Sequence, residues 1–225
     1  MFNDQKENIE NRIENRFNAV ARSKTFRNIV SAFRLDTKEV LDIGCSYGEH
    51  LIHFGNGGTG ITINQDEATE GIRRGLDVHV GNIEEEFNFE KTYDAIYCNN
   101  LLEHLYSPHQ FLYEVRTALK ANGILILGVP VIPFPRYLMQ IKKFCGVLAS
   151  AHINFFTKDS LVLTVTRAGW KVREVRGFRL SKRPLDRMIT FLYPHIYIVA
   201  EPDTTFSYDE KRQKELAGYN HYTRR

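Results

Sequence analysis

Hydrophobic residues recur with helical spacing in two segments near the start of the chain. In residues 4–20, Ile9, Ile13 and Phe17 follow one another every four positions among Asn, Glu and Arg side chains. Residues 24–33 repeat this pattern. Apolar residues three or four positions apart lie on one face of a helix. We therefore expect two amphipathic helices ahead of the rest of the fold.

Between residues 39 and 129, apolar runs of strand length alternate with segments of helical periodicity. Such alternation indicates a parallel sheet with right-handed crossovers and helices on both faces. The last run is continuously apolar, as expected for a strand buried on both faces. The predicted strands are 39–44, 58–63, 77–81, 93–98 and 123–129, and the predicted helices are 48–54, 66–74 and 108–120.

The alternation breaks at three prolines between residues 130 and 135, which cannot continue a strand or a helix interior. An apolar stretch with a lysine pair follows at 137–148, and we expect it to form a helix over the pocket. A further helix is predicted at 157–168. The runs at 170–176 and 193–200 then complete the sheet as an antiparallel hairpin at one edge. The polar tail that follows contains one predicted helix, 208–217.

Composition indicates one soluble domain. The 225 residues are 43% hydrophobic, enough for a substantial core, and the net charge of +3 is too small to indicate a nucleic-acid partner. Cys45, Cys98 and Cys145 are far apart, which argues against a disulfide framework or a zinc site. The polar N-terminus is unlike a signal peptide, and no apolar run reaches the ~20 residues of a transmembrane helix. We expect a cytoplasmic protein without a transmembrane segment.

The most specific pattern lies in residues 40–48, where an apolar strand ends at Gly44 and Gly48 follows four positions later. Glycine at such a turn adopts dihedrals closed to other residues and lets a ligand approach the main chain. Asp42 is expected to place a negative charge at the floor of the pocket. Ligands of parallel sheets bind at the carboxyl ends of the strands. The segments expected at that edge are 42–48, 62–66, 81–83 and 98–104.

In order and spacing, these four segments resemble the class I S-adenosylmethionine-dependent methyltransferases. Residues 40–48 are similar to that family's first motif almost residue for residue, and 93–96 with 102–105 are similar to its fourth-strand signature. Residues 152–157 and 168–170 resemble its small-molecule branch, which includes the ubiquinone-pathway O-methyltransferases. The resemblance covers about residues 38–175. It implies an α/β fold with a Rossmann-like, seven-stranded, mostly parallel sheet, an antiparallel edge hairpin and helices on both faces.

The resemblance also implies S-adenosyl-L-methionine as cofactor, with S-adenosyl-L-homocysteine as product. Thr62 stands where the family has an acid that grips the ribose hydroxyls, and Asn82 stands where an acid holds the adenine amine. An amide or hydroxyl can form those bonds without charge assistance. The Ile83 N–H is expected to serve an adenine ring nitrogen. The predicted cofactor-binding residues are Asp42, Gly44, Cys45, Ser46, Gly48, Thr62, Ile63, Asn64, Gln65, Asn82, Ile83 and Asn99.

Methyl transfer needs alignment of nucleophile, carbon and sulfur in a dry pocket, and a base where the acceptor carries a proton. His104 and His152 are the candidate catalytic bases, because imidazole titrates in the useful range, and a structural role for either stays open. In the ubiquinone-pathway relatives a metal is thought to sit on two glutamates and the histidine. Here Asn100 replaces the first glutamate, so we predict no metal site.

The predicted organisation has three parts. Residues 1–35 are helices that cover the active site, 36–200 are the methyltransferase domain with a lid or substrate insert at 130–156, and 201–225 are a polar tail. The lysine pair in 137–148 also allows weak contact with a membrane surface. The basic residues in 171–187 are interpreted as a solvated edge, with an anionic acceptor as the alternative.

The predicted function is methyl transfer to an O or N atom of a small-molecule acceptor such as a sugar, lipid, quinone or secondary metabolite. A non-catalytic cofactor-binding protein of the same fold is the first alternative. An NAD(P)-dependent oxidoreductase is disfavoured because the glycine spacing is not G-x-G-x-x-G. A nucleic-acid methyltransferase is disfavoured because Asn99–Leu102 lacks the expected prolines. The acceptor and the oligomeric state are left open.

Overall fold

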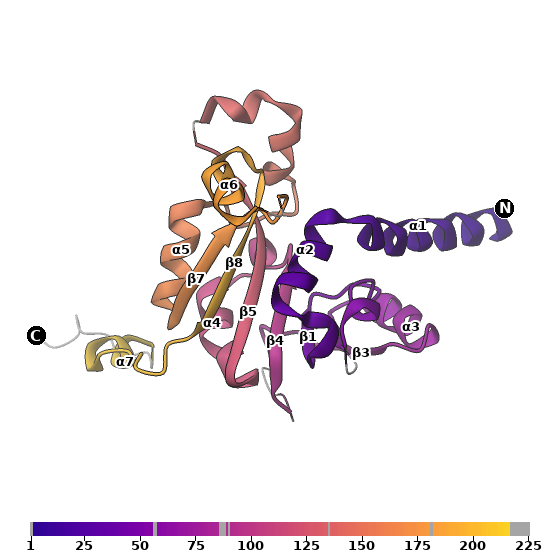
Figure 1. Cartoon of the computed structure of the whole chain (residues 1–225). Coiled ribbons are helices and arrows are strands. Elements are labelled where there is room, and N and C mark those ends of the chain that lie inside the picture. The colour runs from indigo at the N-terminus through magenta and orange to yellow at the C-terminus, as the bar shows by residue number, and fades with distance from the viewer. Residues whose placement is uncertain are drawn as a thin grey trace, which may run out of the picture.

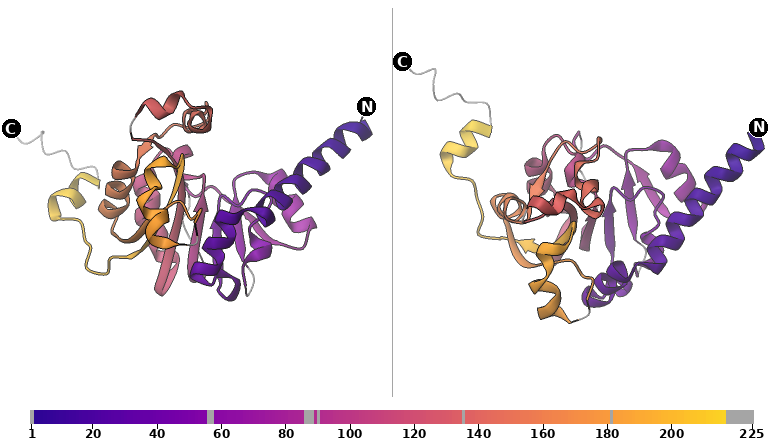
Figure 2. Two further views of the ribbon diagram at one scale, coloured as in Figure 1. Left: turned by 45° about the horizontal axis from the view of Figure 1, so that its top comes forward. Right: turned by 90° about the horizontal axis from the view of Figure 1, so that it is seen from above.

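The computed structural model describes residues 2–55, 58–85, 89, 91–134, 136–180 and 182–216. The two helices predicted at the start are present as α1 (Phe2–Arg22) and α2 (Lys24–Phe33). Ser23 separates them and caps α2, because its Oγ accepts a hydrogen bond from the Phe26 N–H at 3.2 Å. Figures 1 and 2 show α2 against the sheet and α1 extending from the body of the molecule.

The sheet has the strand order β3-β2-β1-β4-β5-β8-β7. The pairs from β3 to β5 are parallel, whereas β8 is antiparallel to both β5 and β7, so the predicted mostly parallel sheet with an antiparallel edge hairpin is confirmed. The strands are β1 (Val40–Ile43), β2 (Thr59–Thr62), β3 (Asp77–Val80), β4 (Tyr93–Asn99), β5 (Leu119–Ile132), β7 (Trp170–Arg176) and β8 (His195–Pro202). An eighth strand, β6 (Phe156–Thr157), pairs with the end of β5 and was not predicted, because two residues leave no periodicity in the sequence.

Helices cover both faces of the sheet, as predicted. On one face, α4 (Pro108–Glu114) and α5 (Lys158–Arg167) bury Phe111, Leu112 and Leu161 in the larger core cluster. On the other face, α2 and α3 (Gln65–Arg73) bury Phe26, Ile29 and Ala68 in the second cluster. From Ala95 to Cys98 the β4 residues alternate between the two clusters, since successive side chains of a strand point to opposite faces.

Three predicted helices differ in the structure. Between β1 and β2 only the 3₁₀ turn η2 (Leu51–His53) forms, because the chain leaves β1 through residues of positive φ and must return to β2 a few residues later. The helix after β4 ends at Glu114 and continues as the 3₁₀ turn η4 (Val115–Ala118), so that β5 begins at Leu119. The helix predicted at 208–217 forms as α7 (Glu210–Leu216), and its predicted last position, 217, lies outside the described residues. Another helix, α6 (Arg183–Met188), lies between β7 and β8 and was not predicted from the sequence.

The insert after β5 also differs from the single helix expected at 137–148. It forms two 3₁₀ helices, η5 (Arg136–Gln140) and η6 (Lys142–Leu148). Figure 1 shows them above the upper end of β5, which is its carboxyl end, and Figure 2 shows the same segment in the middle of the view from above. Leu138, Phe144 and Val147 are buried, so the insert has a small core of its own. This position places it over the edge where ligands of such sheets bind.

Candidate functional site

A cavity of about 580 Å³ opens at the carboxyl edge of the sheet, between the ends of β1 and β2 and the start of α4. Such a volume suits a small ligand or cofactor. Its apolar wall includes Ile43, Leu101 and Phe111. Six residues predicted from the sequence to have functional roles line it: Gly44, Thr62, Ile63, Asn82, Ile83 and His104.

The turn after β1 is shaped by backbone geometry that few residues tolerate. Gly44 and Gly48 have φ values of +80° and +83°, and Ser46 between them has +52°. The Gly44 and Cys45 N–H groups donate to the Ile61 carbonyl at 2.8 and 3.0 Å, which fixes the turn to β2. These two N–H groups therefore hold the turn in place, and the absent side chain of Gly44 leaves its main chain open to the cavity.

The side chain of Cys45 points into the core instead of the cavity. It is buried, and burial raises the pKa of its thiol well above the ordinary value. A Cβ added at Gly60 would lie 2.6 Å from the Cys45 Sγ, so any larger residue at this position of β2 would clash with the thiol. Only the backbone of Cys45 is thus available to a ligand. Gly48 is likewise buried, against Leu76 and Val78.

A glutamate that the sequence analysis missed lies beside the cavity. Glu67, in the first turn of α3, accepts from the Ser46 Oγ–H at 3.0 Å through Oε1 and from the Thr62 Oγ–H at 2.9 Å through Oε2. Asn64 caps the helix: its Oδ1 accepts from the Asp66 and Glu67 N–H groups at 2.9 and 3.2 Å. The start of α3 thus places a carboxylate beside the end of β2, where Thr62 stands in the position at which the family resemblance implies an acid. The signal available in the sequence was an acid five positions after Thr62, at the start of a predicted helix.

The segment after β3 closes the cavity from the side of β2. The Gly81 N–H donates to the Thr62 carbonyl at 3.0 Å, and Asn82 Oδ1 accepts from the Glu84 N–H at 3.1 Å. Glu84 then accepts from the Ser107 N–H at 2.8 Å, which ties this segment to the start of α4. The Asn82 amide therefore faces the cavity with its orientation fixed, and Ile83 packs beside it at 9% exposure.

The other residues predicted to bind cofactor do not line the cavity. Asp42 is buried on the far face of β1, 3.5 Å from His50 Nδ1, and burial raises its pKa, so it does not form the cavity floor. Asn64 and Gln65 belong to the cap and first turn of α3. Asn99 ends β4, and its buried Oδ1 has no hydrogen-bond partner among the described residues. An ordered ligand beside Asn99 could satisfy that oxygen.

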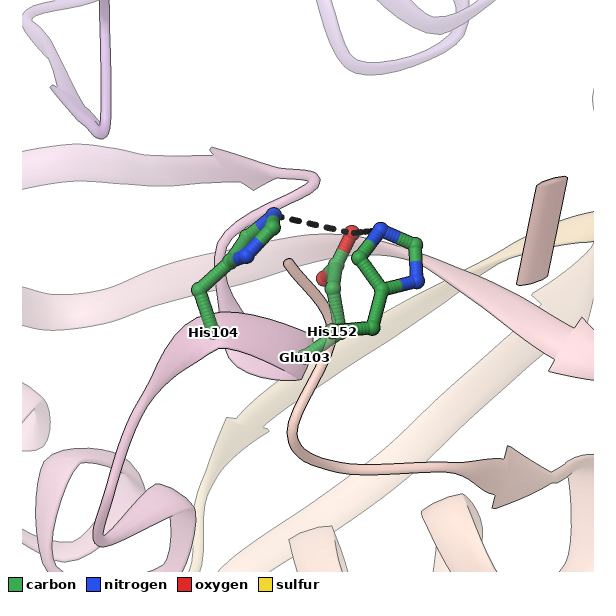
Figure 3. Close-up of side chains that lie close together, drawn as sticks. All are labelled: Glu103, His104 and His152. Atoms are coloured by element: carbon green, nitrogen blue, oxygen red, sulfur yellow. Dashed lines mark ion pairs between the residues drawn. The ribbon is translucent and has the colours of Figure 1, made fainter. Parts of the chain in front are cut away.

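Three side chains meet where the insert touches the 3₁₀ turn η3 (Leu102–His104), as Figure 3 shows. His104 Nε2 and His152 Nε2 both lie 3.9 Å from Glu103 Oε1, and the donor atoms all lie within 4.8 Å of one another. Glu103 is 1% exposed, its Oε2 has no partner among the described residues, and burial raises its pKa. His104 also lines the cavity, whereas His152 is not among the lining residues. These are the donor types that hold a proton or a divalent cation.

Asn100 turns away from this cluster. Its φ is +54°, and its Oδ1 accepts a hydrogen bond from His195 Nε2 at 2.9 Å. This bond joins the segment after β4 to the start of β8. Burial, followed by the charge of Arg179, lowers the pKa of His195 to about 4, so this imidazole is neutral at physiological pH. The neutral ring donates one hydrogen bond and has no charge to offer a ligand.

Comparison with known proteins decides the family. A family model described as a methyltransferase domain matches residues 13–175. The chain belongs to this methyltransferase family. The match and the fold together place it among the class I S-adenosylmethionine-dependent methyltransferases, which confirms the family and fold predicted from the sequence and favours methyl transfer over hydride transfer.

Two relatives and one solved structure show how distant the similarity is. The ubiquinone biosynthesis O-methyltransferase of Hydrogenovibrio crunogenus is 26% identical over 159 residues, 64% of this chain and 66% of that protein. The mitochondrial ubiquinone biosynthesis O-methyltransferase of Schizosaccharomyces pombe is 23% identical over 157 residues, 62% and 57% respectively. The chain thus spans less than two thirds of the length of these relatives. An S-adenosylmethionine-dependent methyltransferase from Mesorhizobium loti shares the fold with a TM-score of 0.60 and 13% identity, over 80% of this chain and 99% of that one.

Among the described residues, no helix is long and apolar enough to cross a membrane. The insert does present apolar side chains to solvent, with Tyr137, Ile141 and Leu148 each about half exposed or more. Contact of 137–148 with a membrane surface stays a prediction, as does the cytoplasmic location.

Proposed function

We propose that this methyltransferase transfers the methyl group of S-adenosyl-L-methionine to an O or N atom of a small-molecule acceptor. The observation that supports the proposal most directly is the cavity at the carboxyl ends of β1 and β2, lined by the glycine turn that the family's first motif implies. Of the two atoms we favour oxygen, because both relatives described above carry the name O-methyltransferase.

In this proposal the nucleoside of the cofactor occupies the cavity. The carboxylate of Glu67 supports Ser46 and Thr62, and together they offer the ribose hydroxyls a charged acceptor that Thr62 alone lacks. Asn82 and the backbone of Ile83 face the adenine. The open main chain at Gly44 lets the amino-acid part of the cofactor pass toward the end of β4, where Asn99 has its unpartnered oxygen.

The reaction itself asks little of the protein, because the sulfonium already activates the methyl group. The site must align the acceptor atom, the methyl carbon and the sulfur, and exclude water. We propose that the insert covers the acceptor on this side and that His104, with His152 behind it, is the group placed to take a proton from an acceptor hydroxyl. The imidazole atom that would accept this proton is Nε2, because Nδ1 donates to the Ala151 carbonyl.

Calorimetry of cofactor-stripped protein tests the cofactor site. We expect S-adenosylmethionine and S-adenosylhomocysteine to bind with one equivalent, and Glu67→Gln to weaken both about 10-fold, which is ~1.4 kcal/mol for one charge-assisted contact. Asp66→Asn is the matched control, because it removes a charge from the same helical turn without touching Ser46 or Thr62. An absence of binding at near-millimolar ligand would remove the proposed function.

A second measurement separates the enzyme from a non-catalytic binding protein of the same fold. Tritium transfer from labelled cofactor to a metabolite library that includes catechols, sugars and amines should label at least one hydroxyl or amine acceptor. Cofactor binding without labelled product in any class would favour the binding protein. A nicotinamide-fluorescence titration on the same sample should show no binding, and saturable binding there would favour the oxidoreductase.

A further inference from the structure

The loop that leaves β7 carries a positive charge to the carboxyl edge of the sheet. β7 is antiparallel to β8, and β8 is antiparallel to β5, so β7 ends at the same edge as the parallel strands. Figure 1 shows the connection from β7 to β8, with α6, at this upper end of the sheet. One row of paired residues crosses the edge from β4 to β7: Asn99, Gly128, Tyr197 and Arg176. The exposed Arg179 follows shortly after the last of them, so it lies at the edge where the proposed site is.

The charges next to Arg179 balance one another without it. Arg176 Nε and Arg183 Nε lie 3.0 and 2.7 Å from Glu174 Oε1. Arg176 Nη1 also lies 3.9 Å from Asp186 Oδ2. Two guanidinium groups thus offset two buried carboxylates. Within the described residues, the Arg179 guanidinium forms no ion pair or hydrogen bond, so its charge is available to a ligand.

The backbone before Arg179 is held in a conformation that a bulky residue rarely adopts. Phe178 has a φ of +54°. The buried carboxylate of Asp186 accepts hydrogen bonds from the N–H groups of residues 178, 179 and 180 at 2.8, 3.1 and 2.9 Å. Asn28 of α2 donates to the Phe178 carbonyl at 2.8 Å. Strained backbone that several contacts hold in place is typical of functional sites. These contacts fix the point from which the Arg179 side chain starts.

Arg179 lies near the side chains that meet over Gly128. A Cβ added at Gly128 would lie 2.4 Å from Asn99 Oδ1 and 2.9 Å from His195 Cε1, so both side chains lie directly over this glycine. After burial, the charge of Arg179 is the second cause of the lowered pKa of His195, which places the guanidinium close to the imidazole. Asn99 is the residue toward which we propose that the amino-acid part of the cofactor extends. Arg179 therefore lies beside the region that a methyl acceptor has to occupy.

We propose that the methyl acceptor carries an anionic group, a carboxylate or a phosphate, that pairs with the Arg179 guanidinium. The inference rests on the proposed function, because it names the class of acceptor for the same site. A guanidinium forms two parallel hydrogen bonds with either anion, and such a pair fixes the orientation of a ligand as well as its affinity. It would anchor one end of the acceptor and leave its hydroxyl or amine free for transfer. For Arg179, this replaces the interpretation of residues 171–187 as a solvated edge.

Calorimetry with matched pairs of probes tests the inference without requiring turnover. Protein loaded with S-adenosylhomocysteine is titrated with 3-hydroxybenzoate and 3-hydroxybenzamide for a carboxylate, and with glucose 6-phosphate and glucose for a phosphate. In at least one pair we expect the anionic probe to bind ~10-fold more tightly than its neutral partner, or better, which is ~1.4 kcal/mol. The pair that shows this preference identifies the source of the anion.

Variants of two arginines assign the preference to one position. Arg179→Gln should abolish it and leave the affinity of the neutral probe unchanged, whereas Arg179→Lys should retain part of it, because an ammonium keeps the charge without the planar fork. The fold is kept in both, since Asp186 binds the backbone of position 179 and not its side chain. Arg187→Gln is the matched control, because it removes another exposed arginine from the connection between β7 and β8. It should keep the full preference.

The outcomes separate this inference from the proposed function. Equal affinities within both pairs, absence of binding by both anionic probes, or a preference that survives Arg179→Gln would each overturn the anionic acceptor. Tritium transfer from labelled cofactor gives the second readout. Labelled product from neutral acceptors alone would overturn the inference and keep methyl transfer. An anion preference that depends on Arg179, without labelled product from any acceptor, would support the anion site and count against methyl transfer.

Discussion

The two halves of the carboxyl edge are built in different ways. One half, formed by residues 44–48, 62–67 and 81–85 and named the cofactor half after its proposed role, is held by contacts between neighbouring loops, such as Thr62 with Glu67 five positions away. The other half, formed by residues 99–104, 136–155 and 195 and named the acceptor half after its proposed role, joins groups far apart in sequence. His104 binds a carbonyl 47 positions away, and Asn100 meets His195 across 95 positions.

This difference separates loops whose backbone shape is fixed from connections whose side chains come from distant parts of the chain. A cofactor of fixed shape needs a backbone of fixed shape, and short loops with positive φ supply it. Long connections such as the insert can bring in side chains from distant parts of the chain without changing the sheet. We therefore expect substitutions in the cofactor half to act on cofactor affinity, and substitutions in the acceptor half to act on the insert.

The largest effect is expected for Gly44→Ala. Alanine at φ +80° costs about 1–2 kcal/mol, and its Cβ would lie 3.2 Å from Leu101 Cδ1 at the cavity wall. The turn can relieve this strain only by moving the main chain that lines the cavity. We expect cofactor affinity to fall at least ~30-fold, which is about 2 kcal/mol, as measured by calorimetry.

Gly75→Ala is the matched control for that prediction. Gly75 has φ +79°, nearly that of Gly44, and an added Cβ would meet nothing within 4 Å. Thermal unfolding should show a comparable loss of stability in both variants, with unchanged cofactor affinity in Gly75→Ala. Equal cofactor affinities in the two variants would mean that the position of Gly44 at the cavity has no effect beyond the strain that both turns share.

The same contrast explains which features the sequence could predict. The strand pattern and the glycine turn of the cofactor half are local. The mostly parallel sheet with its antiparallel edge hairpin, and Gly44, Thr62 and Asn82 at the ligand-binding edge, therefore followed from spacing and resemblance. Glu67 was missed because its role depends on how the Asn64 cap turns α3. The partnership of Glu103 with His152 was missed because the path of the insert is set by tertiary contacts, and no periodicity in 137–148 reports two 3₁₀ helices.

Asn154→Ala tests the acceptor half by loosening the insert. Asn154 Nδ2 donates to the Leu105 carbonyl at 2.6 Å, 49 positions away, beside the two backbone bonds from the insert to Glu103. Losing this partly buried bond should cost about 1–2 kcal/mol in the free energy of unfolding. It should also speed trypsin cleavage after Lys142 several-fold, while cofactor affinity stays within twofold of the wild type.

Asn28→Ala provides the comparison for this variant. Asn28 Nδ2 also donates to a distant backbone carbonyl, that of Phe178 at 2.8 Å, but it lies outside both halves. We expect a similar loss of stability without faster cleavage after Lys142. Equal cleavage in the two variants would mean that global unfolding, and not the insert, governs access to this site.

The smallest expected effect concerns His195, which links the acceptor half to β8. Its pKa is lowered from 6.5 to about 4, first by burial and then by Arg179. The unfolded chain therefore binds more protons than the native state between these values, so the stabilisation is complete above pH 6.5 and is lost as the pH falls toward 4. Because the ring is partly exposed, we expect a loss of about 1–2 kcal/mol in the free energy of unfolding instead of the full value of the shift.

Denaturant unfolding from pH 7 to pH 4.5 should show this loss in the wild type and a smaller one in His195→Gln, whose amide can still donate to Asn100. Parallel curves for the two proteins would mean that the imidazole titrates freely and that the Asn100–His195 contact does not constrain the acceptor half.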